Sequence, residues 1–136
     1  SVSTSYKLGD TVITGITPGT GASSVLANIS AGSGTVKVLK ADGTENTGAV
    51  GTGNKIAVYA NGTLVKQYDV VIYGDINGDG KISVVDLVMM QKQILGTSQL
   101  SGAYAAAADI SRDGKVSVKD LVLLQKHIIN AAQIEQ

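Results

Sequence analysis

The chain has 136 residues, a formal net charge of zero and no cysteine. The lack of cysteine excludes disulfide bonds, and a neutral chain without a basic run argues against nucleic acid as a partner. No apolar stretch approaches the roughly 18–20 residues that a membrane-spanning helix requires. Small domains without disulfides often depend on a bound metal, so a metal is the remaining candidate for a stabilising cross-link.

The first part of the chain, residues 1–73, is rich in Gly, Thr, Val and Ser and predicts a small β-rich module. Runs of β-branched and aliphatic residues at 12–13 and 36–39 favour short strands, and the second run ends in a turn at residues 41–44. Between these strands, residues 23–29 predict one short helix, with Ser23 as its N-terminal cap.

A β-hairpin is the strongest local signal in this part. Residues 55–60 and 63–68 are two strand-like runs that flank Asn61-Gly62, the preferred dipeptide of a two-residue turn. We expect the second arm to continue as far as residue 73. The module therefore contains a small sheet with a helix across one face, and both a β-grasp-like fold and a small sandwich remain open.

The rest of the chain contains a segment that occurs twice. Residues 75–86 return as residues 109–120, with an offset of 34, and 13 of 21 positions agree between 75–95 and 109–129. Both copies place oxygen-bearing side chains at loop positions 1, 3, 5, 9 and 12, with glycine at position 6. This is the ligand order of a calcium loop of the EF-hand type, in which position 7 contributes a backbone carbonyl.

The distribution of acidic residues supports this interpretation. Residues 74–136 contain seven acidic residues, and six of them occupy positions 1, 5 and 12 of the two loops. Three carboxylates in one short loop repel one another unless a cation neutralises them.

A helix is predicted after each loop. Leu87, Met90 and Ile94 follow the first loop at helical spacing, and Leu121, Leu124 and Ile128 repeat the pattern after the second. Gly96 suits the end of the first helix, and residues 102–108 predict a short connecting helix. We expect no helix before either loop, so each repeat consists of a loop and the helix that follows it.

The duplicated loop and helix resemble a type I dockerin, the module that binds cohesin domains in cellulosome-like assemblies. The resemblance covers residues 74–130, and its motif reads Asp86-Leu87-Val88-Met89-Met90 in the first copy and Asp120-Leu121-Val122-Leu123-Leu124 in the second. It implies two domains, an X-like β-rich module over residues 1–73 and an all-α dockerin over residues 74–136, in a chain of α+β class.

The resemblance also implies two calcium ions and their ligands. Lys81 and Lys115 would contribute carbonyl oxygens, Asp86 and Asp120 the closing carboxylates, and the serines at position 9 would act directly or through water. The two implied ligand sets are Asp75, Asn77, Asp79, Lys81, Ser83 and Asp86, and Asp109, Ser111, Asp113, Lys115, Ser117 and Asp120. Because the Ser111 hydroxyl is a short and neutral ligand, we expect the second site to bind calcium more weakly.

A second stripe on each helix lies about 100° from the core stripe and predicts a partner face. One interpretation is a wider core stripe, and the other is an apolar patch rimmed by a cation that contacts another protein. The resemblance favours the second, since dockerins bind cohesin through equivalent helix positions. The residues are Val84, Val85, Val88, Lys92 and Leu95 on the first helix, and Val118, Lys119, Val122, Lys126 and Ile129 on the second. Many type I dockerins carry Ser-Thr at loop positions 10 and 11, where this chain has Val84-Val85 and Val118-Lys119.

The function implied by the resemblance is non-catalytic. The chain would attach its parent protein to a cohesin of a scaffoldin or cell-surface protein, in an extracellular cellulosome or amylosome-like complex. The alternatives are a carbohydrate-binding appendage with a calcium-stabilised anchor, and an EF-hand-like calcium sensor. His127 is the only histidine, and the acidic residues are assigned to the loops, so the sequence contains no candidate catalytic group for an enzyme.

Overall fold

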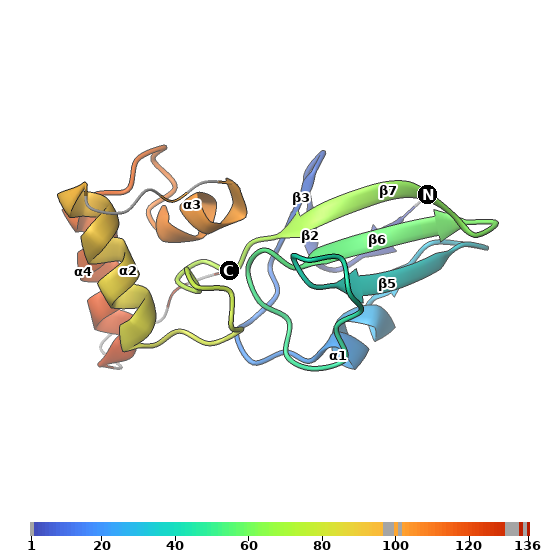
Figure 1. Cartoon of the computed structure of the whole chain (residues 1–136), viewed down its shortest axis with the longest axis horizontal. Helices are drawn as coiled ribbons and strands as arrows, with labels where there is room; N and C mark the ends of the chain where they lie inside the picture. Colours follow the sequence, from blue (N-terminus) through green and yellow to red (C-terminus); the bar gives the residue numbers. More distant parts are fainter. Residues whose placement is uncertain (1, 97–99, 101, 130–133, 135) are drawn as a thin grey trace.

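The computed structural model describes residues 2–96, 100, 102–129, 134 and 136. An N-terminal β-sheet module is followed by a helical part, as expected for an α+β chain (Figure 1). Each part has its own cluster of buried apolar side chains, the first around Ile13 and Ile56 and the second around Met90 and Leu124. Within the described residues, no helix is long and apolar enough to span a membrane.

The N-terminal module is built on one mixed sheet with the strand order β2-β3-β7-β6-β5. Strands β3 and β7 run parallel in the middle, and the other neighbours are antiparallel. A separate pair, β1 with β4, has only two residues in each strand, which is too small for a second layer. The single sheet therefore favours the β-grasp-like alternative over the sandwich. The strands are β1 (Ser3–Thr4), β2 (Lys7–Leu8), β3 (Val12–Thr14), β4 (Ile29–Ser30), β5 (Thr35–Leu39), β6 (Lys55–Ala60) and β7 (Thr63–Val70).

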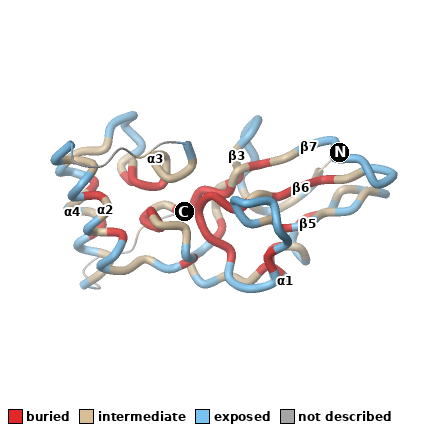
Figure 2. The backbone as a smooth tube through the Cα atoms, in the orientation of Figure 1, coloured by how far each residue is buried: buried red, intermediate tan, exposed pale blue. Residues whose placement is uncertain are grey.

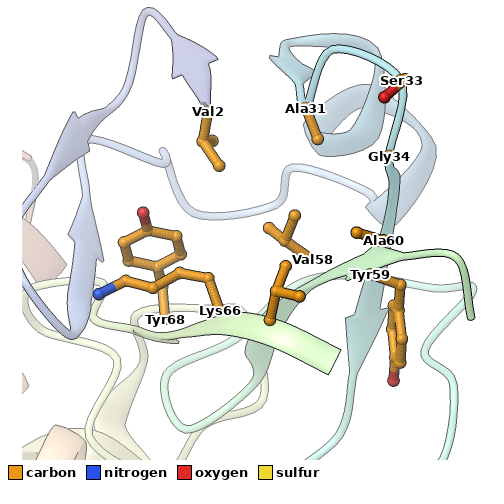
Figure 3. A pocket seen from close by; sticks show the side chains of 10 residues that line it. Val2, Ala31, Ser33, Gly34, Val58, Tyr59, Ala60, Lys66 and Tyr68 are labelled. Atoms are coloured by element: carbon orange, nitrogen blue, oxygen red, sulfur yellow. The ribbon is translucent and has the colours of Figure 1, made fainter. Parts of the chain in front are cut away.

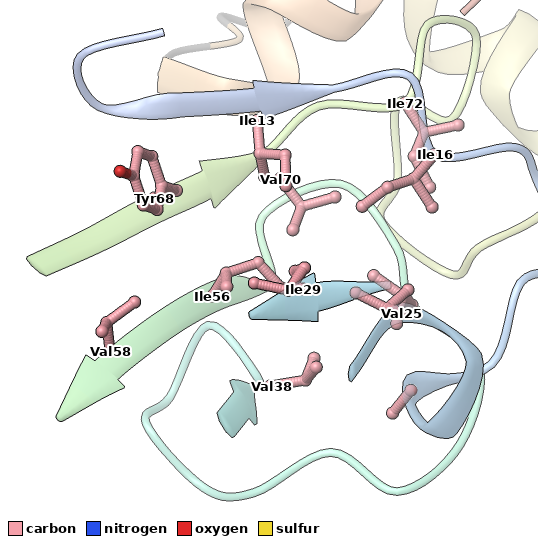
Figure 4. Packing of buried hydrophobic residues seen from close by; sticks show 12 residues of the cluster. Ile13, Ile16, Val25, Ile29, Val38, Ile56, Val58, Tyr68, Val70 and Ile72 are labelled. Carbon is pink, nitrogen blue, oxygen red and sulfur yellow. The ribbon is translucent and has the colours of Figure 1, made fainter. Parts of the chain in front are cut away.

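The core of this module lies between the sheet and the short helix α1 (Ala22–Ala27). The strand register places Val38 opposite Ile56 and Ile13 opposite Val70, and Val25 of the helix belongs to the same buried cluster (Figure 4). The expected cap at Ser23 was wrong, because the helix begins one residue earlier and its N-cap is Gly21. The helix starts there because Ala22 is itself buried and its N–H donates to the carbonyl of Gly48.

The predicted hairpin is confirmed. Ala60 pairs with Thr63, and both turn residues have positive φ, 53° for Asn61 and 78° for Gly62, as a type I′ turn requires. Strand β7 nevertheless ends at Val70 instead of continuing to residue 73. Beyond it, the hydroxyl of Thr52 accepts a hydrogen bond from the N–H of Ile72 and donates one to its carbonyl, so a side chain replaces a neighbouring strand.

The helical part contains α2 (Val84–Leu95), α3 (Gly102–Ala108) and α4 (Val118–Ile128), with α2 against α4 (Figure 1). The predicted core stripes are confirmed, since Met90 and Leu124 are completely buried and the other four stripe residues pack against the same cluster. Helix α2 ends as predicted at Gly96, whose φ of 78° is left-handed.

The expectation that no helix precedes either loop holds only for the first loop. Helix α3 ends at Ala108, directly before Asp109, so the second loop has a short helix before it and a longer one after it. The alanine-rich sequence favours this helix, because alanine has the highest intrinsic helix propensity. Its residues Ala107 and Ala108 are buried, and the Ala107 carbonyl accepts a hydrogen bond from Gly74 at the start of the first repeat.

The two ends of the helical part lie together. The side chain of Gln136 accepts a hydrogen bond from the N–H of Tyr73 at 2.7 Å and donates one to its carbonyl at 2.9 Å. The guanidinium of Arg112, in the second loop, lies 4.0 Å from the centre of the Tyr73 ring. Tyr73, two residues before the first loop, is thus in contact with the second loop and with the end of the chain.

The sheet core gives a stability prediction. Because Ile56 is completely buried between β5, β7 and α1, we expect Ile56→Ala to lower the free energy of unfolding by about 2–5 kcal/mol. Leu64 is 47% exposed on the same sheet, and Leu64→Ala should change it by less than about 0.5 kcal/mol. Chemical denaturation of both variants measures the difference, and equal losses would contradict this core.

Candidate metal centres and partner face

The structure brings the predicted carboxylates together in both loops. One oxygen each of Asp75, Asp79 and Asp86 lie within 4.8 Å of one another. In the second loop, one carboxylate oxygen from each of Asp109, Asp113 and Asp120 also lies within 4.8 Å of the other two. These residues occupy the same loop positions, 1, 5 and 12. Among the described residues, these two acidic triads are the groups with the spacing of a metal site, and both fit the oxygen-rich coordination that calcium prefers.

The carboxylate at position 12 connects the start of each loop to the helix that follows. Oδ1 of Asp86 accepts hydrogen bonds from the N–H groups of Ile76 and Asn77, at 2.9 and 3.0 Å, and Oδ2 accepts one from Ser83 at 2.8 Å. In the second loop, Asp120 accepts from Ser111 at 2.7 Å and from Ser117 at 2.9 Å. Each acidic residue therefore sets the direction in which its helix leaves the loop.

The middle positions make the turn. The carboxylate at position 5 accepts the N–H at position 7 in both loops, from Lys81 to Asp79 at 2.9 Å and from Lys115 to Asp113 at 3.0 Å. At position 6, Gly80 has a φ of 83° and its counterpart in the second loop has one of 90°. Glycine suits this left-handed backbone because it has no Cβ to clash.

The remaining predicted ligands lie where the loop pattern places them. The side chain of Asn77, at position 3, accepts a hydrogen bond from the N–H of Asp79. Ser83 and Ser117, at position 9, are the N-caps of α2 and α4. The Oγ of Ser111 is buried and has no hydrogen-bond partner among the described residues, which leaves it available to an ion or to water.

Position 1 differs between the loops. Oδ2 of Asp75 accepts the N–H of Gly80 at 3.0 Å and that of Thr52, in the N-terminal module, at 2.9 Å. Its Oδ1 is buried and has no hydrogen-bond partner among the described residues. A buried carboxylate oxygen without a donor is unfavourable unless a cation is bound, so this atom supports the fit of calcium to the first loop.

Burial also changes the proton affinity of the first loop. It raises the pKa of Asp75 from 3.8 to about 7, and it raises the pKa of Asp86. In the second loop, the hydrogen bond from the Lys115 N–H lowers the pKa of Asp113, which is exposed. A bound cation would favour the ionised form of the buried carboxylates and so reverse the effect of burial.

The ten residues of the expected partner face are all exposed, so they are not part of a wider core stripe. Val88 and Val122 are 41% and 40% exposed at equivalent places on α2 and α4, and Leu95 and Ile129 at the helix ends are 76% and 71% exposed. Figure 2 shows that the two helices combine buried and exposed residues along their length. The structure thus presents a similar apolar pattern twice on the helical part, with Lys119 in the place of Val85.

The N-terminal module contributes to the first loop, which the sequence did not predict. Residues 50–54, which we call the bridging segment, are all buried although they belong to no helix or strand. Thr52, within this segment, donates to Asp75. The sequence feature that could have indicated this contact is the glycine-rich stretch just before the hairpin, because glycine often occurs where two backbones approach closely.

Away from the loops, a hollow of about 390 Å³ lies beside β6 and β7 (Figure 3). Tyr68 is only 7% exposed there, and Figure 3 shows Tyr59 on the opposite side of its strand from Val58. The hollow therefore lacks the flat, exposed aromatic surface that would support carbohydrate binding. His127 accepts a hydrogen bond from the N–H of Ile134 and lies outside both triads.

The raised pKa values give a pH prediction for the first loop. With calcium absent, Asp75 gains its proton as the pH falls below about 7, and calcium must then displace that proton. Calcium affinity of the first loop should therefore rise between pH 5 and 7, by up to about ten-fold per pH unit, and level off above pH 7. The Asp113→Ala variant isolates this loop, and calcium titrations at pH 5, 6, 7 and 8 measure the dependence; a flat profile would contradict it.

Comparisons with known proteins agree with these loops. Residues 73–129 match the family described as the dockerin type I domain. No curated protein matches the chain. Among solved structures, similar chains come from two complexes of the third cohesin ScaC with mutated ScaB dockerins of Acetivibrio cellulolyticus. The two alignments have 25% and 26% sequence identity and TM-scores of 0.45 and 0.44. Each covers 48% of this chain, and they cover 92% and 96% of the matched chains. The family match places residues 73–129 of this chain in the dockerin type I family.

Proposed function

We propose that this chain is a calcium-dependent docking unit that binds a cohesin and so attaches its parent protein to an extracellular, cellulosome- or amylosome-like complex. The observation that carries the proposal is the match of residues 73–129 to the dockerin type I family. The two acidic triads and the repeated apolar face support it. The partner would be a cohesin of a scaffoldin or cell-surface protein, because cohesin and dockerin form the complexes in the similar solved structures.

The proposed ligand sets follow the loop pattern. Each loop would hold one calcium ion through its three carboxylates, the side chain at position 3, the carbonyl at position 7 and the serine at position 9. The first set is Asp75, Asn77, Asp79, Lys81, Ser83 and Asp86, and the second is Asp109, Ser111, Asp113, Lys115, Ser117 and Asp120. The second site would bind more weakly, because a serine hydroxyl replaces the amide oxygen at position 3 and because, among the described residues, Asp109 accepts hydrogen bonds from its own loop and not from the N-terminal module.

Calcium would act on the partner face through the position-12 carboxylates. Asp86 and Asp120 already link the start of each loop to the first turn of its helix. An ion bound in the loop fixes these carboxylates, and therefore the positions of α2 and α4. The free energy of calcium binding thereby contributes to the stability of the paired helices.

The docking face would consist of the ten exposed residues on α2 and α4. An apolar patch bordered by lysines suits the rim and core pattern of a protein interface. Since the two halves of the face are near copies, a cohesin could engage it in two orientations related by about 180°. The residues are Val84, Val85, Val88, Lys92, Leu95, Val118, Lys119, Val122, Lys126 and Ile129.

The division into domains is part of the proposal. Residues 1–73 would form an X-like module that spaces or stabilises the dockerin of residues 74–136, since each part has its own buried cluster. The close packing at their junction, together with the closeness of Tyr73 to Asp75, which leaves almost no linker, favours a stabilising role. The dockerin domain is non-catalytic, and we extend that conclusion to the chain as a whole.

A calcium sensor is a weaker alternative. Sensors have a full helix-loop-helix and usually glutamate at position 12, whereas here position 12 is aspartate and no helix precedes the first loop. Outside the cell, calcium at millimolar concentration would keep even modest sites filled.

Removing calcium tests the link between loops and helices. We expect EDTA to reduce the helical circular dichroism signal and to abolish cohesin binding over the same range of free calcium, because the ion fixes the start of α2 and α4. Restoring calcium should recover both signals together. A spectrum that does not change on chelation would argue strongly against this coupling.

Substitutions on the two helices test the docking face against a panel of type I cohesins. Val88→Asp with Lys92→Glu, or Val122→Asp with Lys126→Glu, should each leave binding within about ten-fold, since the other half remains usable. Combining all four changes should weaken binding by about 100-fold or more. Val65→Asp, at a residue that is 58% exposed in the N-terminal module, is the control and should have no effect. Loss of binding from either pair alone would exclude two usable orientations.

A further inference from the structure

The bridging segment of the N-terminal module lies directly against the first loop. Its five residues, 50–54, are buried although none belongs to a strand or helix. Loops normally run over the surface, because buried irregular backbone must find partners for its polar groups. In this segment, the partners include the first calcium loop.

The contact with the first loop is made through the backbone of Thr52. Its N–H donates to Oδ2 of Asp75 at 2.9 Å, and both residues are almost completely buried. Its hydroxyl is held by both backbone groups of Ile72, so Thr52 is fixed on two sides. A second bond joins the module to the loop where the N–H of Gly19 donates to the carbonyl of Gly80 at 2.8 Å.

Glycines on both sides allow the two backbones to approach. A Cβ on Gly51 would overlap the carbonyl of Gly78, and one on Gly78 would overlap the carbonyl of Thr52. A Cβ on Gly80 would lie 2.9 Å from the carbonyl oxygen of Val50. The bridging segment and residues 78–80 of the loop are therefore in direct backbone contact, with no space for a side chain between them.

Among the described residues, the second loop has no comparable contact with the bridging segment. The donors to Asp109 in this part of the chain are Asp113 at 3.3 Å and Gly114 at 2.9 Å, both in its own loop, and Asp109 is partly exposed. A Cβ on Gly114 would meet no atom within 4 Å. The two loops are similar in sequence, yet the bridging segment makes these backbone contacts with the first loop, whereas the second loop reaches Tyr73 through the side chain of Arg112.

We propose that the bridging segment is an external part of the first calcium site: the Thr52 N–H positions Asp75 for the ion, and calcium in the first loop in turn stabilises the N-terminal module. This inference rests on the proposed calcium binding and extends it. Groups that orient a metal ligand from behind commonly change metal affinity by about 10–100-fold when they are removed. By linkage, an ion that depends on the segment must also hold the segment in place.

Substitution of Gly51 tests the proposal from the side of the segment. In the Asp113→Ala protein, where only the first loop binds calcium, Gly51→Ala should lower calcium affinity about 10–100-fold in calorimetric titrations. Gly48→Ala is the matched control, because a Cβ there makes only an ordinary contact at 3.7 Å and should leave affinity within about two-fold. In the Asp79→Ala protein, where only the second loop binds, Gly51→Ala should also have no effect. Equal affinities of the Gly51→Ala and Gly48→Ala proteins for the first loop would overturn the proposal.

Amide hydrogen exchange tests whether calcium in the first loop stabilises the N-terminal module. This experiment changes no residue of the bridging segment, so it can be done even if the Gly51→Ala protein does not fold. Calcium added to the Asp113→Ala protein should slow exchange of the Thr52 N–H about ten-fold or more, while calcium added to the Asp79→Ala protein should leave it unchanged. If the first loop takes up calcium but the exchange rate of the Thr52 N–H does not change, this inference is wrong while the proposed function still holds. A protein that takes up no calcium in either loop would instead remove the proposed function on which it rests.

Discussion

The structure depends on one carboxylate, that of Asp75, which is completely buried where the sheet module meets the helical part. It accepts hydrogen bonds from Thr52 of one module and Gly80 of the other, and its second oxygen has no donor among the described residues. A buried carboxylate in this setting is stable as an anion only with a nearby cation, and burial accordingly raises its pKa to about 7. Calcium would satisfy this group and join the two modules at the same point.

Two further carboxylates connect the loops to the helices that follow them. Asp86 and Asp120 each accept N–H groups from the start of a loop and from the N-cap of the following helix. An ion that binds them therefore acts on the direction of α2 and α4, whose outer faces hold the exposed valines and lysines. The apolar face itself contributes little to the core, so its geometry depends on the loops and on the buried contact between Met90 and Leu124 in one cluster.

The sequence was sufficient wherever a local rule determines the structure. Asn61-Gly62 marks a turn because both residues tolerate positive φ, and the spacing of Leu87, Met90 and Ile94 marks a buried helix face. It was insufficient where tertiary contacts decide. Strands β1, β2 and β4 have two residues each and no apolar period, and β7 ends at Val70, two residues before Ile72, whose two backbone groups are hydrogen-bonded to the hydroxyl of Thr52. The six loop carboxylates were predictable from their spacing, whereas the donor from Thr52 comes from 23 residues away in the chain.

The duplication shows how similar sequences can lie in unequal surroundings. The two helices present matching faces, with Val88 and Val122 almost equally exposed, so nothing in the exposure of these residues distinguishes the halves for a partner. The two loops are not equivalent, because within the part of the chain that the structure describes the bridging segment contacts the first loop and not the second. If both halves of the face bind a cohesin as proposed, the docking orientation would vary while the contact between the first loop and the bridging segment stays the same. Chain order contributes to the asymmetry, since Asp75 lies five residues beyond the end of β7 and is thereby brought against the segment that packs beside that strand. The sequence contributes as well, because the first loop has Gly78, which leaves room for the backbone of Thr52, where the second loop has Arg112.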